Sequence, residues 1–212
     1  MERRTFLLKI IDEKTVTTLD SLKKCLPAIL GEIDGIKNAS FWYVEDMVFA
    51  YYEISSGGEE ASKKAGGLFR SFFENEYGSS MIFISSPGNM RLMYNAIGTP
   101  REDKGTVRHR VFITRLKPDS HEEYKKRHDA ISPKPGEKRE SPTNNFTIWN
   151  GGDYICGYAE IDKDYIPPDT EEARQAAHTW ETRMLEIMDW LTDDVDHISG
   201  ERHEKIGCLY KS

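Results

Sequence analysis

Cysteine is scarce in this chain of 212 residues. Its three cysteines are odd in number, lie far apart and form no CxxC pair, so the sequence predicts neither a disulfide framework nor a zinc site. His178, His197 and His203 have no second ligand at the spacing that metal sites use, and no glycine-rich phosphate loop follows a strand pattern. We therefore expect a protein without a metal and without a cofactor.

The chain also lacks an excess of positive charge and long apolar runs. The formal net charge is −7, which argues against nucleic acid or a membrane surface as a partner, because binding to either requires a concentrated positive field. No run approaches the roughly 20 apolar residues of a membrane-spanning helix, and the first apolar run is interrupted by Lys9 and too short for a signal peptide. The composition, 38% hydrophobic and 31% charged, predicts a soluble, cytoplasmic, globular protein.

The sequence does contain an internal repeat. Residues of the first half recur in the second half at an offset of 106 and then 107 positions, and one inserted residue accounts for the change. The matched pairs are Phe6 with Phe112, Pro27 with Pro133, Asn38 with Asn145, Trp42 with Trp149, and Glu53 with Glu160. A repeat of this length predicts two copies of one structural unit.

Short β-rich runs occur at matching places in the two copies. One run opens each copy, at 5–11 and 108–117. Two further runs, joined by a tight polar turn, predict a hairpin in each copy, 39–44 with 47–54 and 144–149 with 153–162. We expect the last apolar runs, 90–95 and 205–211, to close the copies as final strands.

A helix is expected after each hairpin. Apolar residues at steps of three and four predict one over 173–191, behind Pro168 and Asp169 as entry signals. The pattern over 61–77 is weaker because Gly66-Gly67 interrupts it. The resulting order, β-α-β-β-α-β, is that of the ferredoxin-like unit, an antiparallel sheet with both helices on one face.

We therefore predict an α+β fold made of two tandem ferredoxin-like β-α-β-β-α-β units, residues 1–97 and 107–212. A single unit would leave one sheet face in water, so the two are expected to pack sheet against sheet as an intramolecular pseudo-dimer, a pseudo-dimeric α+β barrel. Further homo-oligomers are compatible with this arrangement.

One helix of the second copy carries residues suited to acid–base chemistry. Ser120 and Glu123 have the spacing of a capping box, which sets the helix phase and places Tyr124, Arg127 and His128 on one inward face. An ordinary amphipathic helix with hydrogen-bonded polar aromatics explains this face. A histidine that exchanges protons near neutral pH is the alternative, and spacing alone does not decide between them.

Three stretches of the second copy together resemble a known family. They read RLKPDSHEEYKKRHDAISP, NNFTIWNGGDYICGYAEID and TWETRMLEIM. Over about residues 108–211 the chain closely resembles the L-rhamnose mutarotases, small α+β barrel proteins that interconvert the α and β anomers of L-rhamnose. The most specific part is the Y-x-x-R-H helix motif. The resemblance implies an isomerase whose partner is a small-molecule sugar, L-rhamnose or a related deoxy-sugar.

The resemblance also implies a set of site residues. The family's proton donor falls on His128 and a sugar-binding tyrosine on Tyr124. A second tyrosine falls on Phe146, which keeps the ring and loses the hydroxyl, and two adjacent tryptophans fall on Trp180 and Glu181. We expect these five residues to form the site. The first copy has Thr18 and Leu22 where Tyr124 and His128 stand, so it is expected to keep the fold without the site.

Other features have plainer interpretations. The segment 133–144 is rich in proline, glycine and charge, which predicts a surface loop, and a lid over the pocket is the alternative. The matched Trp42 and Trp149 are expected in packing, and Glu53 and Glu160 at the ends of their hairpins are expected in solvent.

Three functions are carried forward. The first is an L-rhamnose mutarotase-like epimerase in which His128 protonates the sugar ring oxygen. The second is a non-catalytic carbohydrate-binding or regulatory protein, suggested by the substituted aromatic positions. The third is a monooxygenase or haem-degrading protein, because the same architecture hosts such activities.

Overall fold

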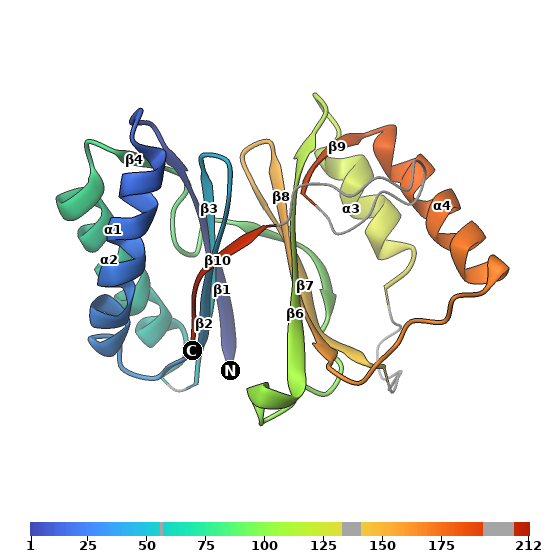
Figure 1. The fold of residues 1–212 in the computed structure, drawn as a ribbon, viewed down its shortest axis with the longest axis horizontal. Helices are drawn as coiled ribbons and strands as arrows, with labels where there is room; N and C mark the ends of the chain where they lie inside the picture. The colour runs from blue at the N-terminus through green and yellow to red at the C-terminus, as the bar shows by residue number, and fades with distance from the viewer. Residues whose placement is uncertain (56, 133–140, 193–205) are drawn as a thin grey trace. The chain divides into compact units, whose positions relative to one another are not determined.

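The computed structural model describes residues 1–55, 57–132, 141–192 and 206–212. The chain divides into two compact units. Unit 1 comprises Met1–Met90 and Ile206–Ser212, and unit 2 comprises Arg91–Lys205. The α+β class is confirmed, because each unit combines two α-helices with one antiparallel sheet (Figure 1).

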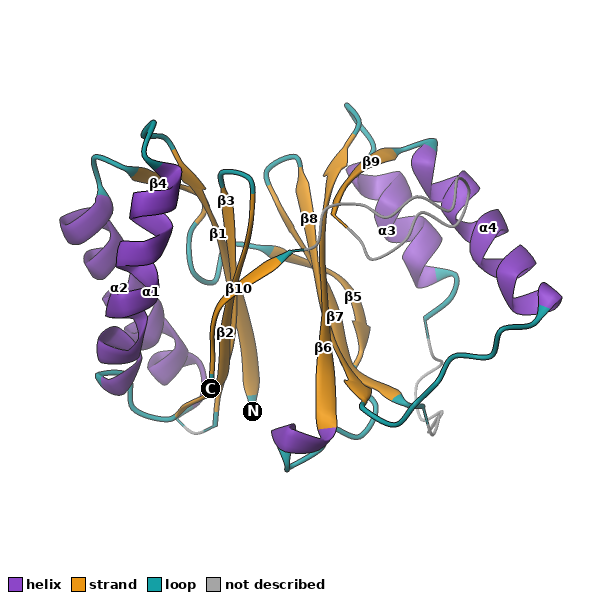
Figure 2. Ribbon diagram, viewed as in Figure 1, coloured by secondary structure: helices purple, strands orange, loops and turns teal. Residues whose placement is uncertain are grey.

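Unit 1 follows the predicted order and adds one strand from the far end of the chain. Its elements are β1 (Glu2–Ile10), α1 (Thr15–Gly31), β2 (Ile36–Val44), β3 (Met47–Ile54), α2 (Gly58–Tyr77), β4 (Met81–Ser85) and β10 (Gly207–Lys211). The strand order in its sheet is β10-β2-β3-β1-β4. Both helices lie on one face of this sheet (Figure 2).

Unit 2 repeats this plan. Its elements are β5 (Arg91–Ala96), the 3-10 turn η1 (Lys104–Thr106), β6 (Val107–Leu116), α3 (His121–Asp129), β7 (Thr143–Gly151), β8 (Tyr154–Asp162), α4 (Glu171–Leu185) and β9 (Met188–Thr192). The strand order is β5-β7-β8-β6-β9, the same as in unit 1 when equivalent strands are exchanged. This correspondence supports the duplication that the sequence repeat predicts. The packing of the two sheets as a pseudo-dimer stays a prediction.

The two closing strands do not lie where the sequence placed them. The run at 90–95 was expected to close the first copy, but β5 pairs with β7 in unit 2. The run at 205–211 was expected to close the second, but β10 pairs with β2 in unit 1. The edge beside β1 and β6 is already taken by β4 and β9, so each closing strand adds to the opposite edge of the other sheet. The described units therefore differ from 1–97 and 107–212 by an exchange of one strand, and the division into two copies stays a prediction.

The helix predicted over 173–191 is shorter than expected. It ends at Leu185, and Met188–Thr192 forms β9 instead. Periodicity missed this strand because Met188 and Leu191 fit a helical spacing, whereas the backbone at this point pairs with the edge of β6. The loop predicted over 133–144 lies largely outside the described residues, and its last two residues begin β7.

The conserved spacing of Asn, Tyr and Glu in the two halves marks a repeated polar contact. In unit 1 the Asn38 amide and the Tyr51 hydroxyl donate to Glu53 Oε1 at 3.1 and 2.8 Å. In unit 2 Asn145 and Tyr158 donate to Glu160 Oε1 at 3.0 and 3.1 Å. The expectation that both glutamates lie in solvent is wrong, because they are 1% and 0% exposed. Burial is tolerated because these hydrogen bonds replace those of water.

The helix-facing side of the first sheet packs a dense apolar core. The Phe6 ring contacts the rings of Phe41 and Phe69 at centroid distances of 5.8 and 5.2 Å. Leu22 of α1 lies in the same core and is fully buried. Among the described residues, no helix is long and apolar enough to cross a membrane.

Candidate active site

Helix α3 presents the face that the sequence predicts, although its start differs. The capping box does not form, because the Ser120 side chain makes no cap hydrogen bond and Glu123 Oε1 accepts instead from Arg127 Nε at 2.8 Å. The phase is nevertheless as expected: Tyr124, Arg127 and His128 are the buried residues of this helix. Arg127 also pairs with Glu186 at 3.0 Å, which ties α3 to the end of α4.

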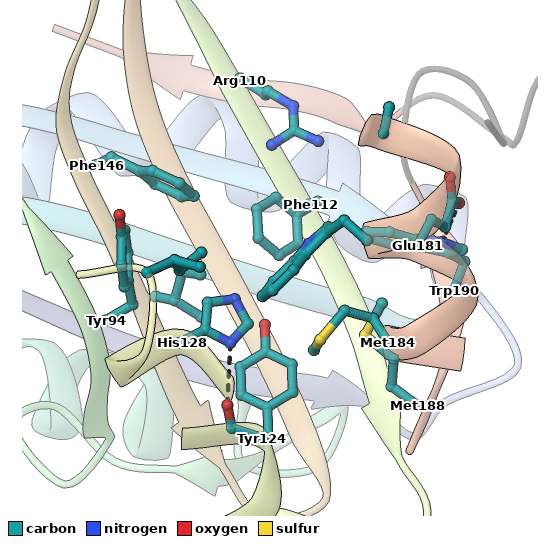
Figure 3. Close-up of a pocket in the computed structure, with 14 residues that line it drawn as sticks. Tyr94, Arg110, Phe112, Tyr124, His128, Phe146, Glu181, Met184, Met188 and Trp190 are labelled. Atoms are coloured by element: carbon teal, nitrogen blue, oxygen red, sulfur yellow. Dashed lines mark hydrogen bonds between the residues drawn. The ribbon is translucent and has the colours of Figure 1, made fainter. Parts of the chain in front are cut away.

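Tyr124 and His128 stack one helical turn apart. Their ring centroids are 4.3 Å apart and their planes differ by 23°. His128 Nδ1 lies 3.0 Å from the carbonyl oxygen of Tyr124. A carbonyl can only accept a hydrogen bond, so the neutral ring carries its proton on Nδ1 and keeps the lone pair on Nε2. In Figure 3 Nε2 of His128, the ring nitrogen without the dashed hydrogen bond, and the Tyr124 hydroxyl both point toward the cavity.

Burial sets the protonation states of this pair. It lowers the pKa of His128 to about 4, because the charged imidazolium is poorly solvated there. It also raises the pKa of Tyr124 far above its ordinary value. At neutral pH the site therefore holds a neutral imidazole, which is a base, beside a protonated phenol, which is a hydrogen-bond donor.

The two side chains face a cavity of about 220 Å³ inside unit 2 (Figure 3). Its walls are mostly aromatic and aliphatic. The residues that line it are Tyr94, Arg110, Phe112, Tyr124, His128, Ile131, Phe146, Ile148, Ala177, Trp180, Glu181, Met184, Met188 and Trp190. The volume is below the roughly 300–1,000 Å³ of pockets for drug-sized ligands, so it suits a smaller molecule.

All five residues that the sequence assigned to the site line this one cavity. Trp180 of α4 packs edge-on against His128, with centroids 5.2 Å apart and planes at 87°. Phe146 of β7 lies on the wall opposite α4 and contacts Tyr94 at 5.2 Å. Glu181 is 3% exposed, and its Oε1 accepts a hydrogen bond of 2.6 Å from Trp190 Nε1. The glutamate therefore fixes an indole at the wall.

Sequence reasoning missed four charged or aromatic lining residues, besides five aliphatic ones. Tyr94 comes from β5, and its ring lies edge-on to His128 at 5.6 Å. Arg110 and Phe112 lie two positions apart on β6, and Trp190 lies on β9. The period-two spacing of Arg110 and Phe112 could have identified them, because alternate residues of a strand share a face. Nothing in the sequence indicated Tyr94, because its place depends on the strand exchange.

Arg110 gives the cavity its positive charge. Among the described residues that line it, Arg110 is the only arginine or lysine. Its guanidinium carbon lies 5.1 Å from the centre of the Phe112 ring. Its positive charge partly offsets the rise that burial causes in the pKa of Tyr124. No three His, Cys, Asp or Glu side chains are grouped to hold a metal ion in the described part of the chain.

Comparison with known proteins gives a match for the part of the chain that supplies most of this cavity's lining. Residues 109–210 match the L-rhamnose mutarotase family. This half is similar to the L-rhamnose mutarotases. The resemblance predicted from the sequence is thereby confirmed, and a mutarotase-like function in this part of the chain is supported. We refer to residues 109–210 as the mutarotase-like half.

Other comparisons add little. No curated protein matches the chain. A crystal structure of an anthrone oxidase-like protein is 15% identical, covers 97% of this chain and 88% of its own, and has a TM-score of 0.40. A likeness this distant carries no argument about function.

Unit 1 lacks the residues that define the site of the mutarotase-like half. Leu22 stands where His128 would be and is fully buried in the aromatic core. Thr18 stands at the position of Tyr124, and its hydroxyl donates to Asp12 at 3.0 Å. A leucine at this position cannot exchange a proton, so unit 1 has no counterpart of His128 at the equivalent position.

Proposed function

We propose that the mutarotase-like half interconverts the α and β anomers of a deoxy-sugar, L-rhamnose or a close relative, inside the cavity of unit 2. One observation carries the proposal. A buried, neutral imidazole turns its free lone pair into an enclosed cavity of monosaccharide scale, beside a phenol and a guanidinium. The family match to residues 109–210 supports the same assignment.

Anomer exchange moves one proton and breaks one bond. The hydrogen of the anomeric hydroxyl leaves, the anomeric carbon forms a carbonyl, and its bond to the ring oxygen breaks so that the ring oxygen gains a proton. The open-chain aldehyde turns about its first carbon–carbon bond and closes on the other face. Because the proton lost equals the proton gained, the reaction needs no external acid, base or oxidant.

His128 performs both proton transfers in this scheme. Its Nε2 accepts the proton of the anomeric hydroxyl, and it is unprotonated at neutral pH because burial lowers the pKa of His128 to about 4. The imidazolium so formed then donates that proton to the ring oxygen. The proton-donor role implied by the family thus belongs to the second step. One well-placed acid–base group contributes roughly 10²–10⁴-fold to a rate, which is ample for a reaction that already proceeds in water.

Tyr124 and Arg110 stabilise the charge that develops between these two steps. As the ring opens, negative charge appears on the ring oxygen before it is protonated. The Tyr124 hydroxyl is positioned to donate a hydrogen bond, and the Arg110 guanidinium supplies positive charge. Both effects are stronger in a cavity walled by Phe112, Phe146 and Trp180 than in water, because few solvent dipoles screen them.

The aromatic walls of the cavity favour a deoxy-sugar as the proposed substrate. A methyl group and the C–H face of a pyranose are apolar, and they are favourably placed against aromatic rings. Trp180 and Phe146 offer such surfaces, and Tyr94 adds a third. A sugar with a hydroxyl in place of the methyl group would lose part of this contact and would bury an extra polar group.

The decisive experiment measures anomer exchange by NMR magnetisation transfer with L-rhamnose, L-fucose and related sugars. We expect exchange above the buffer rate with at least one deoxy-sugar, and a fall of roughly 10²–10⁴-fold in His128→Gln. His121→Gln is the matched control, because His121 lies on the same helix and contacts the Gly152 carbonyl instead of the cavity. An undiminished rate in His128→Gln would remove His128 from the mechanism.

A non-catalytic sugar-binding role is the second candidate. It is favoured by Phe146, which offers no hydroxyl to a sugar, and by Glu181, whose carboxylate is engaged with Trp190. Binding of the same sugars by calorimetry, without exchange faster than buffer, would support this role and contradict the catalytic one.

A further inference from the structure

Two adjacent glycines lie in the middle of the continuous helix α2 of unit 1, and packing explains only one of them. Glycine is a poor helix former, so a pair in a helix interior calls for a reason. A Cβ on Gly66 would lie 3.2 Å from the Cβ of Pro87, so the close approach of the 86–89 turn accounts for this glycine. A Cβ on Gly67 would meet no atom within 4 Å. Packing alone would therefore accept a side chain there.

The space above Gly67 belongs to a pocket of about 360 Å³. It is formed entirely by unit 1, from the start of β1, one face of α2 and the turn after β4. Its lining residues are Arg4, Glu59, Ser62, Lys63, Gly66, Gly67, Arg70, Pro87, Gly88 and Asn89. Lys63, Gly67 and Arg70 are four and three residues apart, so they share one face of the helix. Because Gly67 has no side chain, the pocket stays open between Lys63 and Arg70.

The pocket is positively charged in a chain that is acidic overall. Arg4, Lys63 and Arg70 line it together with a single carboxylate, Glu59, and Arg4 also pairs at 2.7 Å with Glu2, which lies outside the lining. Lys63 pairs with that carboxylate at 2.8 Å, but both side chains are more than 70% exposed, so the pair is easily exchanged for another partner. Among the described residues no hydrogen bond or ion pair engages Arg70. A guanidinium without a partner beside an open cavity favours an anionic ligand.

A buried hydroxyl in the same lining also lacks a partner. Ser62 is 4% exposed, and its Oγ makes no hydrogen bond. Buried polar side-chain atoms in folded proteins are nearly always hydrogen-bonded, so an unpaired one calls for a partner. Rotation of this short side chain toward the pocket would let its hydroxyl donate to an anion lying between Arg4 and Arg70.

We propose that this pocket, which we call the α2 pocket, binds a phosphate-bearing small metabolite. The Arg70 guanidinium can hold phosphate oxygens in a two-pronged contact, and the positive charge of Arg4, an ammonium and a hydroxyl complete the set. A phosphate dianion matches three cations better than a single carboxylate does. The α2 pocket lies in unit 1 and the sugar cavity in unit 2, so this proposal does not depend on the proposed catalysis.

The first test measures thermal unfolding of the full chain with inorganic phosphate, with sodium chloride added to equal ionic strength in the reference. We expect phosphate to raise the melting temperature of the wild type, and calorimetry to show an affinity at least about tenfold weaker in Arg70→Ala and in Arg4→Ala. Lys24→Ala is the matched control, because Lys24 is an exposed cation of α1 outside the pocket. Equal shifts with phosphate, acetate and chloride would overturn the proposal.

The second test uses the open position above Gly67. Leucine is a far better helix former than glycine, and its side chain would extend into the α2 pocket. Gly67→Leu is therefore expected to raise the melting temperature without ligand and to abolish the phosphate-dependent shift. If Gly67 served only the helix structure, the substitution would not both raise the melting temperature and remove the effect of phosphate. A Gly67→Leu protein that binds phosphate as the wild type does would show that the α2 pocket is not the site.

Discussion

At the scale of single residues, burial decides what His128 can do. A histidine in water would be part protonated near neutral pH, whereas this one is 5% exposed and has a pKa lowered to about 4. Its Nδ1 is committed to the Tyr124 carbonyl, so the reactive atom is Nε2. The same environment keeps Tyr124 protonated. Two groups that could each serve as acid or base in water are thereby given different tasks.

The pH dependence of the exchange rate follows from this assignment. His128 must start as the neutral base, which is present above its pKa of about 4 and is lost as the pH falls through that value. After subtraction of the buffer reaction, we expect a catalysed rate that is level from about pH 5.5 to 8 and that declines below about pH 4.5.

NMR exchange rates across this range test the profile, and circular dichroism at each pH shows that the protein remains folded. A rate that falls as the pH rises past about 6.5 would instead indicate a histidine that works from its protonated form. That outcome would contradict the general-base role of Nε2.

At the scale of elements, β5 and β10 each complete the sheet of the other sequence copy. Met93 of β5 is 1% exposed in the core of unit 2, and Leu209 of β10 is 6% exposed in the core of unit 1. Each strand enters its sheet at the edge beside β7 or β2 with a similar irregularity of register. Each closing strand thus supplies a buried side chain to the sheet built mainly from the other sequence copy.

Paired substitutions test this exchange. Met93→Ala is expected to destabilise unit 2 by about 2–5 kcal/mol, the usual cost of removing such a side chain from a core, and Leu209→Ala is expected to do the same to unit 1. Hydrogen exchange measured by mass spectrometry should show reduced protection of β7 in the first variant and of β2 in the second. Loss of protection in unit 1 alone from Met93→Ala would contradict the pairing of β5 with β7.

At the scale of the whole molecule, the exchange makes each half of the chain incomplete. A fragment of residues 107–212 keeps β6 to β10 but loses β5, which leaves the edge of β7 unpaired, and it also loses β2, the partner of β10. Unpaired strand edges readily accept another strand. We expect two such fragments to exchange their β10 strands and form a homodimer.

Light scattering coupled to size-exclusion chromatography measures this directly. The full-length chain at the same concentration is the reference, and addition of a fragment of residues 1–106 should convert the homodimer into a complex of the two halves. A fragment 107–212 that stays a folded monomer at all concentrations would show that the exchanged strand is dispensable.

Much of the fold could be read from the sequence. The offset of about 107 residues between matched positions predicts two like units, and period-two runs with tight turns predict both hairpins. The end of α4 and the strands β4 and β9 were not foreseen, because short apolar runs fit helix and strand periods alike. Glu53 and Glu160 were misjudged because each is buried by hydrogen bonds from an Asn on the neighbouring strand and from a Tyr two residues earlier on its own strand, and these contacts form only in the folded sheet.

The sequence by itself indicated the repeat and the helix that carries Tyr124 and His128, which depend on local periodicity, and its family resemblance indicated the five residues of the proposed sugar site. The tertiary structure decided which sheet each closing strand joins, and thereby brought Tyr94 against His128. It also decided that His128 is neutral, because the loss of solvation that lowers its pKa comes from every element packed around it.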